Sequence, residues 1–203
     1  MARSDSSVEV VIDPVRSKHL THFEQELNAS LDRHSKVESE VVRRSEQGVI
    51  IRDGVLNLPS RTDFRCLRGE AETQRDLRSP TVTEFEPVEL SLSKTLSVTV
   101  FPFNWDELKI SFDSGDDHKR LLRLRMWYLE WFLPRRDPSN SALKGVLHSI
   151  RGPKRNGNLW QVCIDMGSAP SSALTELLLA LESRGVSELT LGTELDKVES
   201  IET

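Results

Sequence analysis

The strongest chemical signal in this chain is the segment 118–160, which is rich in basic and aromatic residues. It holds ten Lys or Arg residues against two acids, Glu130 and Asp137, so it carries +8 in a chain of net charge −5. Three of the four tryptophans lie in it: Trp127, Trp131 and Trp160. Cations gathered in this way bind carboxylates or phosphates. The alternative is that the acidic remainder of the chain neutralises them and that the tryptophans are core residues.

Five of these basic residues are candidates for contact with a partner, because loop and hairpin positions are less easily neutralised internally than helix positions. They are Arg135, Arg136, Arg151, Lys154 and Arg155. We therefore predict a non-enzymatic protein-interaction or regulatory module whose basic surface (118–160) binds an acidic protein partner. The first alternative is weak, charge-based binding of nucleic acid through the same patch, with an affinity that falls steeply as salt is added.

The second candidate site is the turn 165–172, which follows an expected strand and begins an expected helix. Free N–H groups and the positive end of the helix dipole hold anions at such a turn, and Gly167, Ser168 and Ser171 would line the site. A second alternative function is thus an enzyme acting on a small anionic substrate here, with Asp165 as acid or base. Ordinary helix capping explains the same residues without a ligand.

Two other polar clusters are better explained without a ligand. Asp113, Asp116 and Asp117 do not have the spacing of a calcium loop, and acids at the start of a helix need no metal. His19 and His22 lie three residues apart on an expected helix, but zinc requires three or four converging ligands. We expect both histidines on a solvated helix surface.

Cys163 and His148 lie on strands that we expect to be neighbours, so Cys163 could be a nucleophile and His148 its general base. Residue parity places their side chains on opposite faces of the sheet, so they cannot form a hydrogen-bonded pair. His148 is instead expected at the edge of the core with a backbone partner. Two cysteines also provide no disulfide framework and too few ligands for a closed zinc site. We expect no catalytic residue, no metal and no cofactor.

The elements that must position these residues are clearest in the last ninety residues. The expected strands are 107–112, 145–151, 160–166 and 189–191, with a turn at 153–158. Expected helices are 117–133 and the leucine-rich segment between Pro170 and Gly185. The resulting order, β-α-β-β-α-β over 107–192, resembles the ferredoxin-like arrangement, in which two helices cover one face of an antiparallel sheet.

Before this unit, we expect a smaller α+β region that contains β-hairpins. Val8, Val10 and Ile12 alternate with other residues as in a strand, which Pro14 would end. A helical stripe is expected next, formed by Leu20, Phe23, Leu27 and Leu31. Hairpins are expected at 49–58, around Asp53-Gly54, and at 88–100.

The predicted organisation of the α+β chain has five segments. They are a disordered N-terminus (1–7), an N-terminal α+β region (8–58), a linker or long loop (59–80), a C-terminal α+β ferredoxin-like domain (81–193) and an acidic disordered tail (194–203). The linker is predicted because 59–80 is polar and poor in apolar residues. The sequence has no run of about 18 apolar residues, so we expect a cytoplasmic protein with no membrane contact. The oligomeric state is left open.

Overall fold

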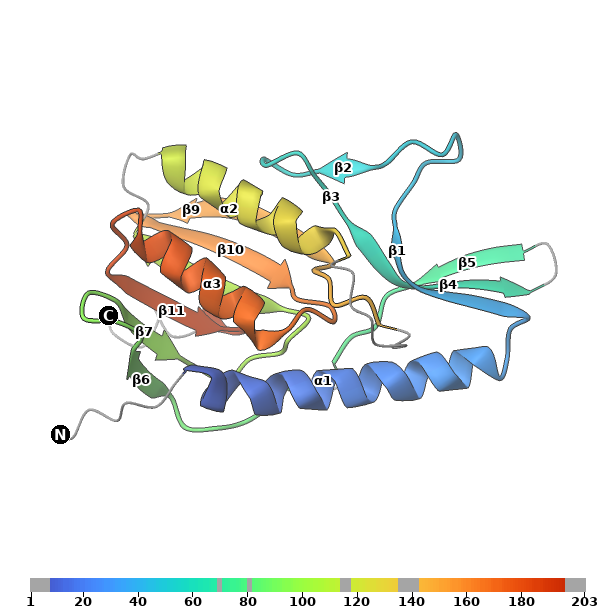
Figure 1. Cartoon of the computed structure of the whole chain (residues 1–203), viewed down its shortest axis with the longest axis horizontal. Helices are drawn as coiled ribbons and strands as arrows, with labels where there is room; N and C mark the ends of the chain where they lie inside the picture. The colour runs from blue at the N-terminus through green and yellow to red at the C-terminus, as the bar shows by residue number, and fades with distance from the viewer. Residues whose placement is uncertain (1–7, 69–70, 80–81, 114–117, 135–142, 196–203) are drawn as a thin grey trace.

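The computed structural model describes residues 8–68, 71–79, 82–113, 118–134 and 143–195 (Figure 1). Within these ranges the chain forms three helices and eleven strands, so the fold is mixed α+β, as the sequence predicts. The strands form a six-stranded sheet, a three-stranded sheet and a short two-stranded hairpin.

The six-stranded sheet forms the larger part of the molecule. Its strands, in spatial order, are β6 (Val88–Ser91), β7 (Ser97–Val100), β11 (Glu188–Gly192), β8 (Leu108–Asp113), β10 (Leu159–Asp165) and β9 (Ser149–Asn156). Neighbouring strands are antiparallel, except that β11 and β7 are parallel. The sheet therefore has two strands more than the expected four-stranded unit, and it contains a parallel pair.

Two helices, α2 (His118–Phe132) and α3 (Ser171–Glu182), lie on one face of this sheet (Figure 1). Apolar residues at every second position of β8 and β10 point toward them and form the main core, whereas Ser111 and Cys163 belong to the opposite, polar face. Pro170 precedes α3, whose leucines are buried, as the sequence predicts. The hairpin expected at 88–100 is also confirmed, as β6 and β7.

The smaller sheet is built from β1 (Lys36–Val42), β4 (Arg61–Arg68) and β5 (Ala71–Arg75), in the order β1-β4-β5. The long helix α1 (Val8–Leu31) spans both parts of the molecule (Figure 1). Its first half packs on the main core, and its second half packs through Phe23 and Leu27 on the smaller sheet. The hairpin expected at 49–58 is present in part, as β2 (Arg52–Asp53) and β3 (Leu58–Pro59), but its turn spans residues 54–57 and Asp53 lies in β2, so the two-residue turn at Asp53-Gly54 is wrong.

The strand expected at Val8–Ile12 is wrong, because these residues form the start of α1. Val8, Ile12 and Val15 are buried at helical spacing, whereas Val10 is exposed. Packing on the main core thus overrides the strand preference of the β-branched residues. Pro14 lies inside the helix with its ring on the exposed side, so it does not end the element.

The linker expected at 59–80 is also wrong, because this stretch contains β4 and β5. The polar composition of this stretch does not indicate a loop, because Arg61, Thr62 and Asp63 are buried in β4 and have polar partners in the fold. The exposed residues of β5 are polar because that strand is at an edge of its sheet. The division of the chain into separate domains stays a prediction.

The strand expected at 145–151 begins later, at Ser149, and continues to Asn156. Lys154 and Arg155 therefore lie on β9 itself and not in the following turn, which consists of residues 157–158. The segments predicted as a disordered N-terminus (1–7) and as most of the tail lie outside the described residues. Leu195 is buried, so packed structure extends beyond the predicted start of the tail at Glu194.

Candidate functional site

The most unusual feature of the molecule is a fully buried histidine surrounded by acids from three strands. His148 lies just before β9, where its backbone N–H donates to Asp165 O (3.0 Å) and its carbonyl accepts from Arg61 N (2.8 Å). Its ring nitrogen Nε2 lies 2.9 Å from Glu40 Oε1 of β1, and Nδ1 lies 2.8 Å from Asp63 Oδ1 of β4. Asp165 of β10 is 3.9 Å from Nδ1. We call these four residues the His148 cluster.

The carboxylates keep His148 in its charged form. Burial alone would lower its pKa, but Asp165, Asp63 and Glu40 together raise the pKa of His148 well above its usual value. Nε2 is hydrogen-bonded to Glu40 and Nδ1 lies within ion-pair distance of Asp63, so the imidazolium is an ionic bridge between the two sheets and not a free base. The predicted backbone partner of the His148 ring is thus wrong, and no acid had been expected there.

Glu40 is the most completely satisfied acid in the cluster. Its side chain accepts from the Ser168 hydroxyl and from the backbone N–H of Lys144, and Arg61 Nη1 donates to its carbonyl (2.5 Å). Burial raises the pKa of Glu40, but His148 and these donors outweigh burial and hold the pKa below its usual range. The residue also adopts a left-handed backbone (φ 51°), which suits a side chain fixed by many partners.

The turn predicted to hold an external anion holds carboxylates of the chain itself. The Ser168 hydroxyl donates to Glu40 and the Ser171 hydroxyl donates to Asp13 of α1. Gly167 (φ 50°) brings the backbone against the His148 ring. An added anion would have to displace internal carboxylates, so the structure offers no vacant anion site at Ser168 and Ser171 among the described residues.

Asp165 connects the His148 cluster to a surface groove of about 660 Å³. Its side chain is 26% exposed, and Oδ1 accepts from Gly167 N (3.0 Å). Burial raises the pKa of Asp165 to about 7, although the His148 charge opposes the rise. Arginines that also line the groove are Arg43, Arg61, Arg78 and Arg151. A carboxyl with a near-neutral pKa in a groove can exchange a proton with a bound ligand.

A second hollow, of about 320 Å³, runs along α1 and shares Ser79 and Asn104 with the groove. His19 lines it and is buried, so the solvated surface expected for this residue is wrong. Within the described part of the chain, neither ring nitrogen of His19 has a hydrogen-bond partner. Burial lowers the pKa of His19, which favours its neutral form.

The structure separates the basic residues that the sequence grouped together. Arg135 and Arg136 lie outside the described residues. Arg151 and Lys154 pair with Cys163 and Gln161 on the polar face of the sheet, whereas Arg155 pairs with Trp160 on the helix-covered face. Arg151 donates to Cys163 Sγ (3.1 Å), so Cys163 and His148 have different partners, as predicted.

Two basic residues of 118–160 are bound internally, but by backbone carbonyls and not by the acidic side chains that the alternative interpretation expects. Arg120 is buried and donates to the carbonyls of Asp113 and Arg184, and Lys144 donates to the carbonyl of Ser39 (2.5 Å). Arg151, Lys154 and Arg155 are exposed. In the part of the chain that the structure describes, no carboxylate forms an ion pair with these three.

Sequence reasoning missed the His148 cluster because its members are far apart along the chain, at positions 40, 63, 148 and 165. A charged residue inside a strand is not a local signal of burial, because strands at a surface carry charges too. In the described ranges, no group of three or more His, Cys, Asp or Glu residues is placed to hold a metal ion. Of the predicted acidic cluster, Asp116 and Asp117 lie outside these ranges.

No family model, no curated protein and no solved structure matches this chain. Among the described residues, no helix combines the length and the apolar character needed to cross a membrane. The cytoplasmic location stays a prediction.

Proposed function

We propose that this chain is a non-enzymatic protein-interaction module that binds an acidic partner through the basic edge of its six-stranded sheet. The observation that carries the proposal is the exposure of Arg151, Lys154 and Arg155 on β9, without ion-paired carboxylates in the described ranges. Arg151 and Arg155 each use a donor internally, on Cys163 Sγ and on the carbonyl of Gly157, and their other guanidinium N–H groups can form charge-assisted hydrogen bonds with an incoming carboxylate.

The position of β9 supports recognition at an edge. This strand is the last in the sheet order, so its outer side has no neighbouring strand in that sheet. Arg151 and Lys154 project to one face of the sheet and Arg155 to the other. An acidic segment that runs along β9 would therefore meet cations on both sides of the edge, and steering by these charges would accelerate its association.

The test is a charge reversal at the edge, Lys154→Glu with Arg155→Glu, using poly-L-glutamate as the probe. The wild-type chain should bind the polymer at low salt, and the double variant should bind at least about tenfold more weakly. The matched control is Arg33→Glu with Lys94→Glu, which makes the same change in net charge at exposed positions elsewhere. Equal binding by both double variants would reject the proposal.

Nucleic-acid binding is an outcome of the same experiment. If a duplex DNA competes with the polymer and binds more tightly, with an affinity that decreases steeply with added salt, the partner is a nucleic acid. That result would replace the acidic protein as the ligand of the β9 edge.

A second candidate function, an acid–base site for a small anionic substrate, is favoured by the position of Asp165 in the groove. Arg78 and Arg151 line the groove beside this carboxyl and would hold the anion. Sulfate serves as the probe because it does not titrate near neutral pH. Its binding should weaken as Asp165 loses its proton near pH 7, and Asp165→Asn should remove this pH dependence. Absence of sulfate binding by the wild type, or no effect of Arg78→Ala with Arg151→Ala, would end this candidate.

For the fold, we infer that β8, α2, β9, β10, α3 and β11 form a ferredoxin-like unit, extended by β6 and β7. The strand order β11-β8-β10-β9 and the antiparallel pairing of these neighbours support the inference. An experimental structure with another strand order would reject it.

A further inference from the structure

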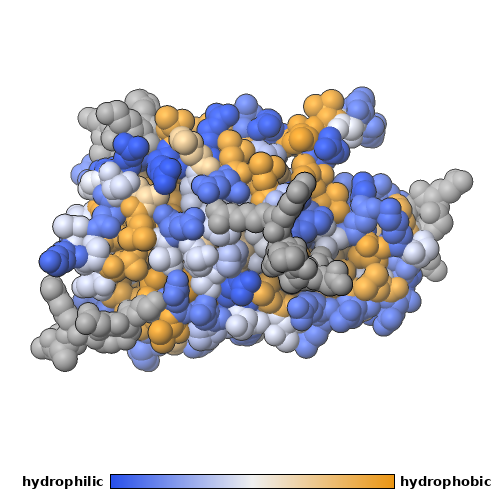
Figure 2. Space-filling model, viewed as in Figure 1, coloured by the Kyte–Doolittle hydropathy of each residue, from blue (hydrophilic) through white to orange (hydrophobic). Residues whose placement is uncertain are grey.

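The outward face of α2 carries apolar residues that the core does not use. Leu122 is 57% exposed and Met126 is 53% exposed, and Leu133, directly after the helix, is 63% exposed. Leu129 lies between them along the chain and is partly buried. The spacing of four, three and four residues places these side chains on one stripe of the helix. We call Leu122, Met126, Leu129 and Leu133 the α2 stripe. Figure 2 shows apolar surface, interrupted by polar surface, over the region of α2.

The opposite side of α2 already contributes to the main core. Leu124, Trp127, Tyr128 and Trp131 are buried there, and Trp127 Nε1 donates to Ala173 O of α3 (2.8 Å). A helix on the surface of a folded domain needs one apolar face, and the other is normally polar. This helix has two apolar faces on opposite sides. Exposed apolar side chains gathered along one side of a helix, as Leu122, Met126 and Leu133 are, are typical of an interaction surface.

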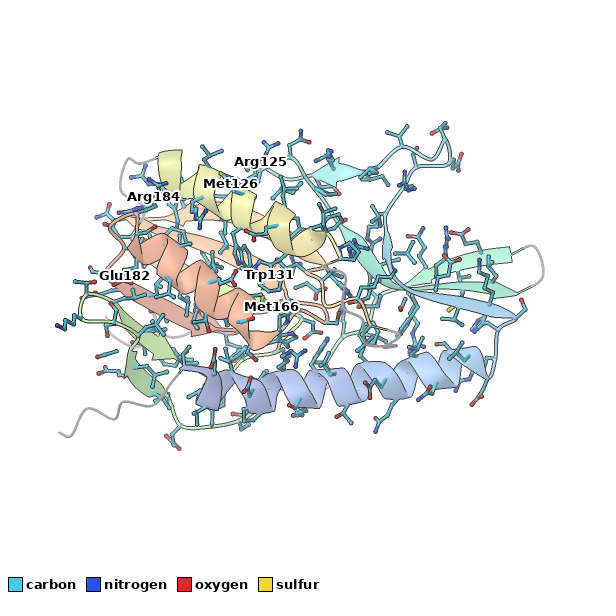
Figure 3. All side chains as sticks on the ribbon, viewed as in Figure 1. Arg125, Met126, Trp131, Met166, Glu182 and Arg184 are labelled. Atoms are coloured by element: carbon cyan, nitrogen blue, oxygen red, sulfur yellow. The ribbon has the colours of Figure 1, made fainter. Side chains whose placement is uncertain are left out.

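Charged residues lie on both sides of the α2 stripe. Arg125 borders one side, and Arg123 and the exposed Glu130 border the other. Arg125 and Met126 both lie on the outer surface of the helix (Figure 3). Arg125 is on the side of the helix that faces β9, because Tyr128, three residues later on the same side, reaches the carbonyl of His148 (3.1 Å). Arg155, on the helix-covered face of β9, and Arg125 of α2 therefore border the same region of the surface.

The arginines beside the α2 stripe have no internal counter-ion among the described residues. In the described part of the chain, no carboxylate forms an ion pair with Arg123 or Arg125. An acidic group placed beside the α2 stripe would pair with them.

We propose that the α2 stripe is a docking site for an acidic amphipathic helix of a partner protein. The apolar side chains of that helix would pack on Leu122, Met126 and Leu133, and its flanking carboxylates would pair with Arg123 and Arg125. This inference rests on the proposed function, in which the partner is acidic, and it adds the form in which the partner binds. Methionine suits the site because its flexible side chain adapts to the packed residues.

A second copy of this chain is the competing occupant of the stripe. In an antiparallel two-fold pair of α2 helices, the two Arg125 side chains would share one border of the interface without a carboxylate between them. In a parallel pair, Arg125 of each copy would instead lie opposite the side of its mate that carries Arg123 and Glu130. An acidic helix supplies carboxylates on both borders, and self-association is the outcome of the test below that would overturn this choice.

The probe for this inference is a synthetic peptide of about three heptads, with leucine at its apolar positions and glutamate at the others. A scrambled peptide of the same composition has the same charge without an apolar face. Fluorescence anisotropy should show that the ordered peptide binds the full chain at least about tenfold more tightly than the scrambled one. Equal binding would overturn the docking site and leave charge-based recognition intact.

The matched variants are Leu122→Ser with Met126→Ser, and Val49→Ser with Val55→Ser as the control. All four residues are exposed, so both double variants should keep the wild-type melting temperature, which is measured first. The stripe variant should bind the ordered peptide at least about tenfold more weakly, and the control should bind it like the wild type. Equal loss in both variants, or no loss in the stripe variant, would overturn the inference.

The remaining outcomes separate this inference from the proposed function. If Lys154→Glu with Arg155→Glu leaves peptide binding unchanged while the stripe variant loses it, the docking site stands and the β9 edge is rejected. If neither peptide binds, both proposals are rejected. If sedimentation shows self-association of the wild type that the stripe variant lacks, the stripe is an interface between copies, and the docking proposal is overturned.

Discussion

Gly167 allows the turn after β10 to pass directly against the ring of His148. A Cβ atom at this position would lie 2.6 Å from both His148 Nε2 and Val146 O, and both of these residues are buried. Gly157 has a similar backbone (φ 56°), but a Cβ atom there meets nothing within 4 Å. Both positions thus impose the same backbone cost on alanine, of about 1–2 kcal/mol, and only one imposes a steric clash.

We therefore predict that Gly167→Ala lowers the free energy of unfolding by about 1–3 kcal/mol more than Gly157→Ala, because overpacking in a core costs about that much. Urea unfolding followed by tryptophan fluorescence measures the two losses. Equal losses would show that the contact between Gly167 and His148 does not constrain the fold.

Asp165 should make the stability of the protein depend on pH. Its pKa in the folded state is about 7, whereas an aspartate in an unfolded chain has a pKa of about 3.9. Between these values the folded state holds a proton that the unfolded chain has released. The free energy of unfolding should therefore fall as pH rises from about 4 to 7, by up to about 1.4 kcal/mol per pH unit.

The pKa values of His148 and Glu40 are also shifted, and they affect the free energy of unfolding in separate pH ranges. The raised pKa of His148 adds a loss of stability in the same direction above about pH 6.5, and the lowered pKa of Glu40 causes a loss only on acidification below about pH 4.5. Between those two limits, Asp165→Asn should abolish the fall in stability with rising pH that urea unfolding measures, and should leave only the opposite, rising contribution of His19, whose pKa burial lowers. A variant that keeps the wild-type slope there would contradict the assignment.

Helices and strands with one simple pattern were predictable from the sequence, and those shaped by distant partners were not. The leucines of α3 and the alternating residues of β8 each face one core, so local periodicity located them. Val8–Ile12 shows both a strand preference and a helical spacing, and only the packing of α1 on the main core decides between them. The polar strand β4 looked like a loop because the partners of Arg61 and Asp63 come from elsewhere in the chain.

The α2 helix provides an element-scale test of its two apolar faces. Leu124 is fully buried, and Leu122, two residues earlier, is largely exposed. Leu124→Ala should lower the free energy of unfolding by about 2–5 kcal/mol, because it leaves a cavity in the main core. Leu122→Ala should change it by less than about 0.5 kcal/mol. Thermal or urea unfolding gives both values, and a large loss in Leu122→Ala would mean that the outer face is part of the core.

At the scale of the whole molecule, the two sheets are joined by buried contacts and not only by the chain. Helix α1 packs on both, and Arg16 of α1 donates to the carbonyl of Ala169 (2.7 Å) before α3. The His148 cluster links β1 and β4 of the smaller sheet to β10 of the larger one. Separating the sheets would leave the His148 imidazolium without the carboxylates of Glu40 and Asp63. A buried charge that loses its partner is costly, so a state with only one sheet folded is unfavourable. We expect the sheets to unfold together.

Two probes can follow the two sheets separately. All four tryptophans lie at 105–160, in the part built on the larger sheet, and Cys66 is buried in β4 of the smaller sheet. In a Cys163→Ser background, the urea midpoints from tryptophan fluorescence and from Cys66 thiol labelling should coincide. Separate midpoints in this background would contradict a single cooperative unit.

In Glu40→Ala, the two urea midpoints should no longer coincide, because the substitution leaves the His148 imidazolium with one carboxylate fewer. Loss of one partner from a buried ion pair costs about 3–5 kcal/mol, and the smaller sheet depends on that link for its attachment. The Cys66 midpoint should therefore move to lower urea than the fluorescence midpoint. The control is Glu38→Ala on the same strand, whose partly exposed pairs with Lys36 and Arg65 contribute at most about 1 kcal/mol. Midpoints that still coincide in Glu40→Ala would show that α1 alone couples the sheets.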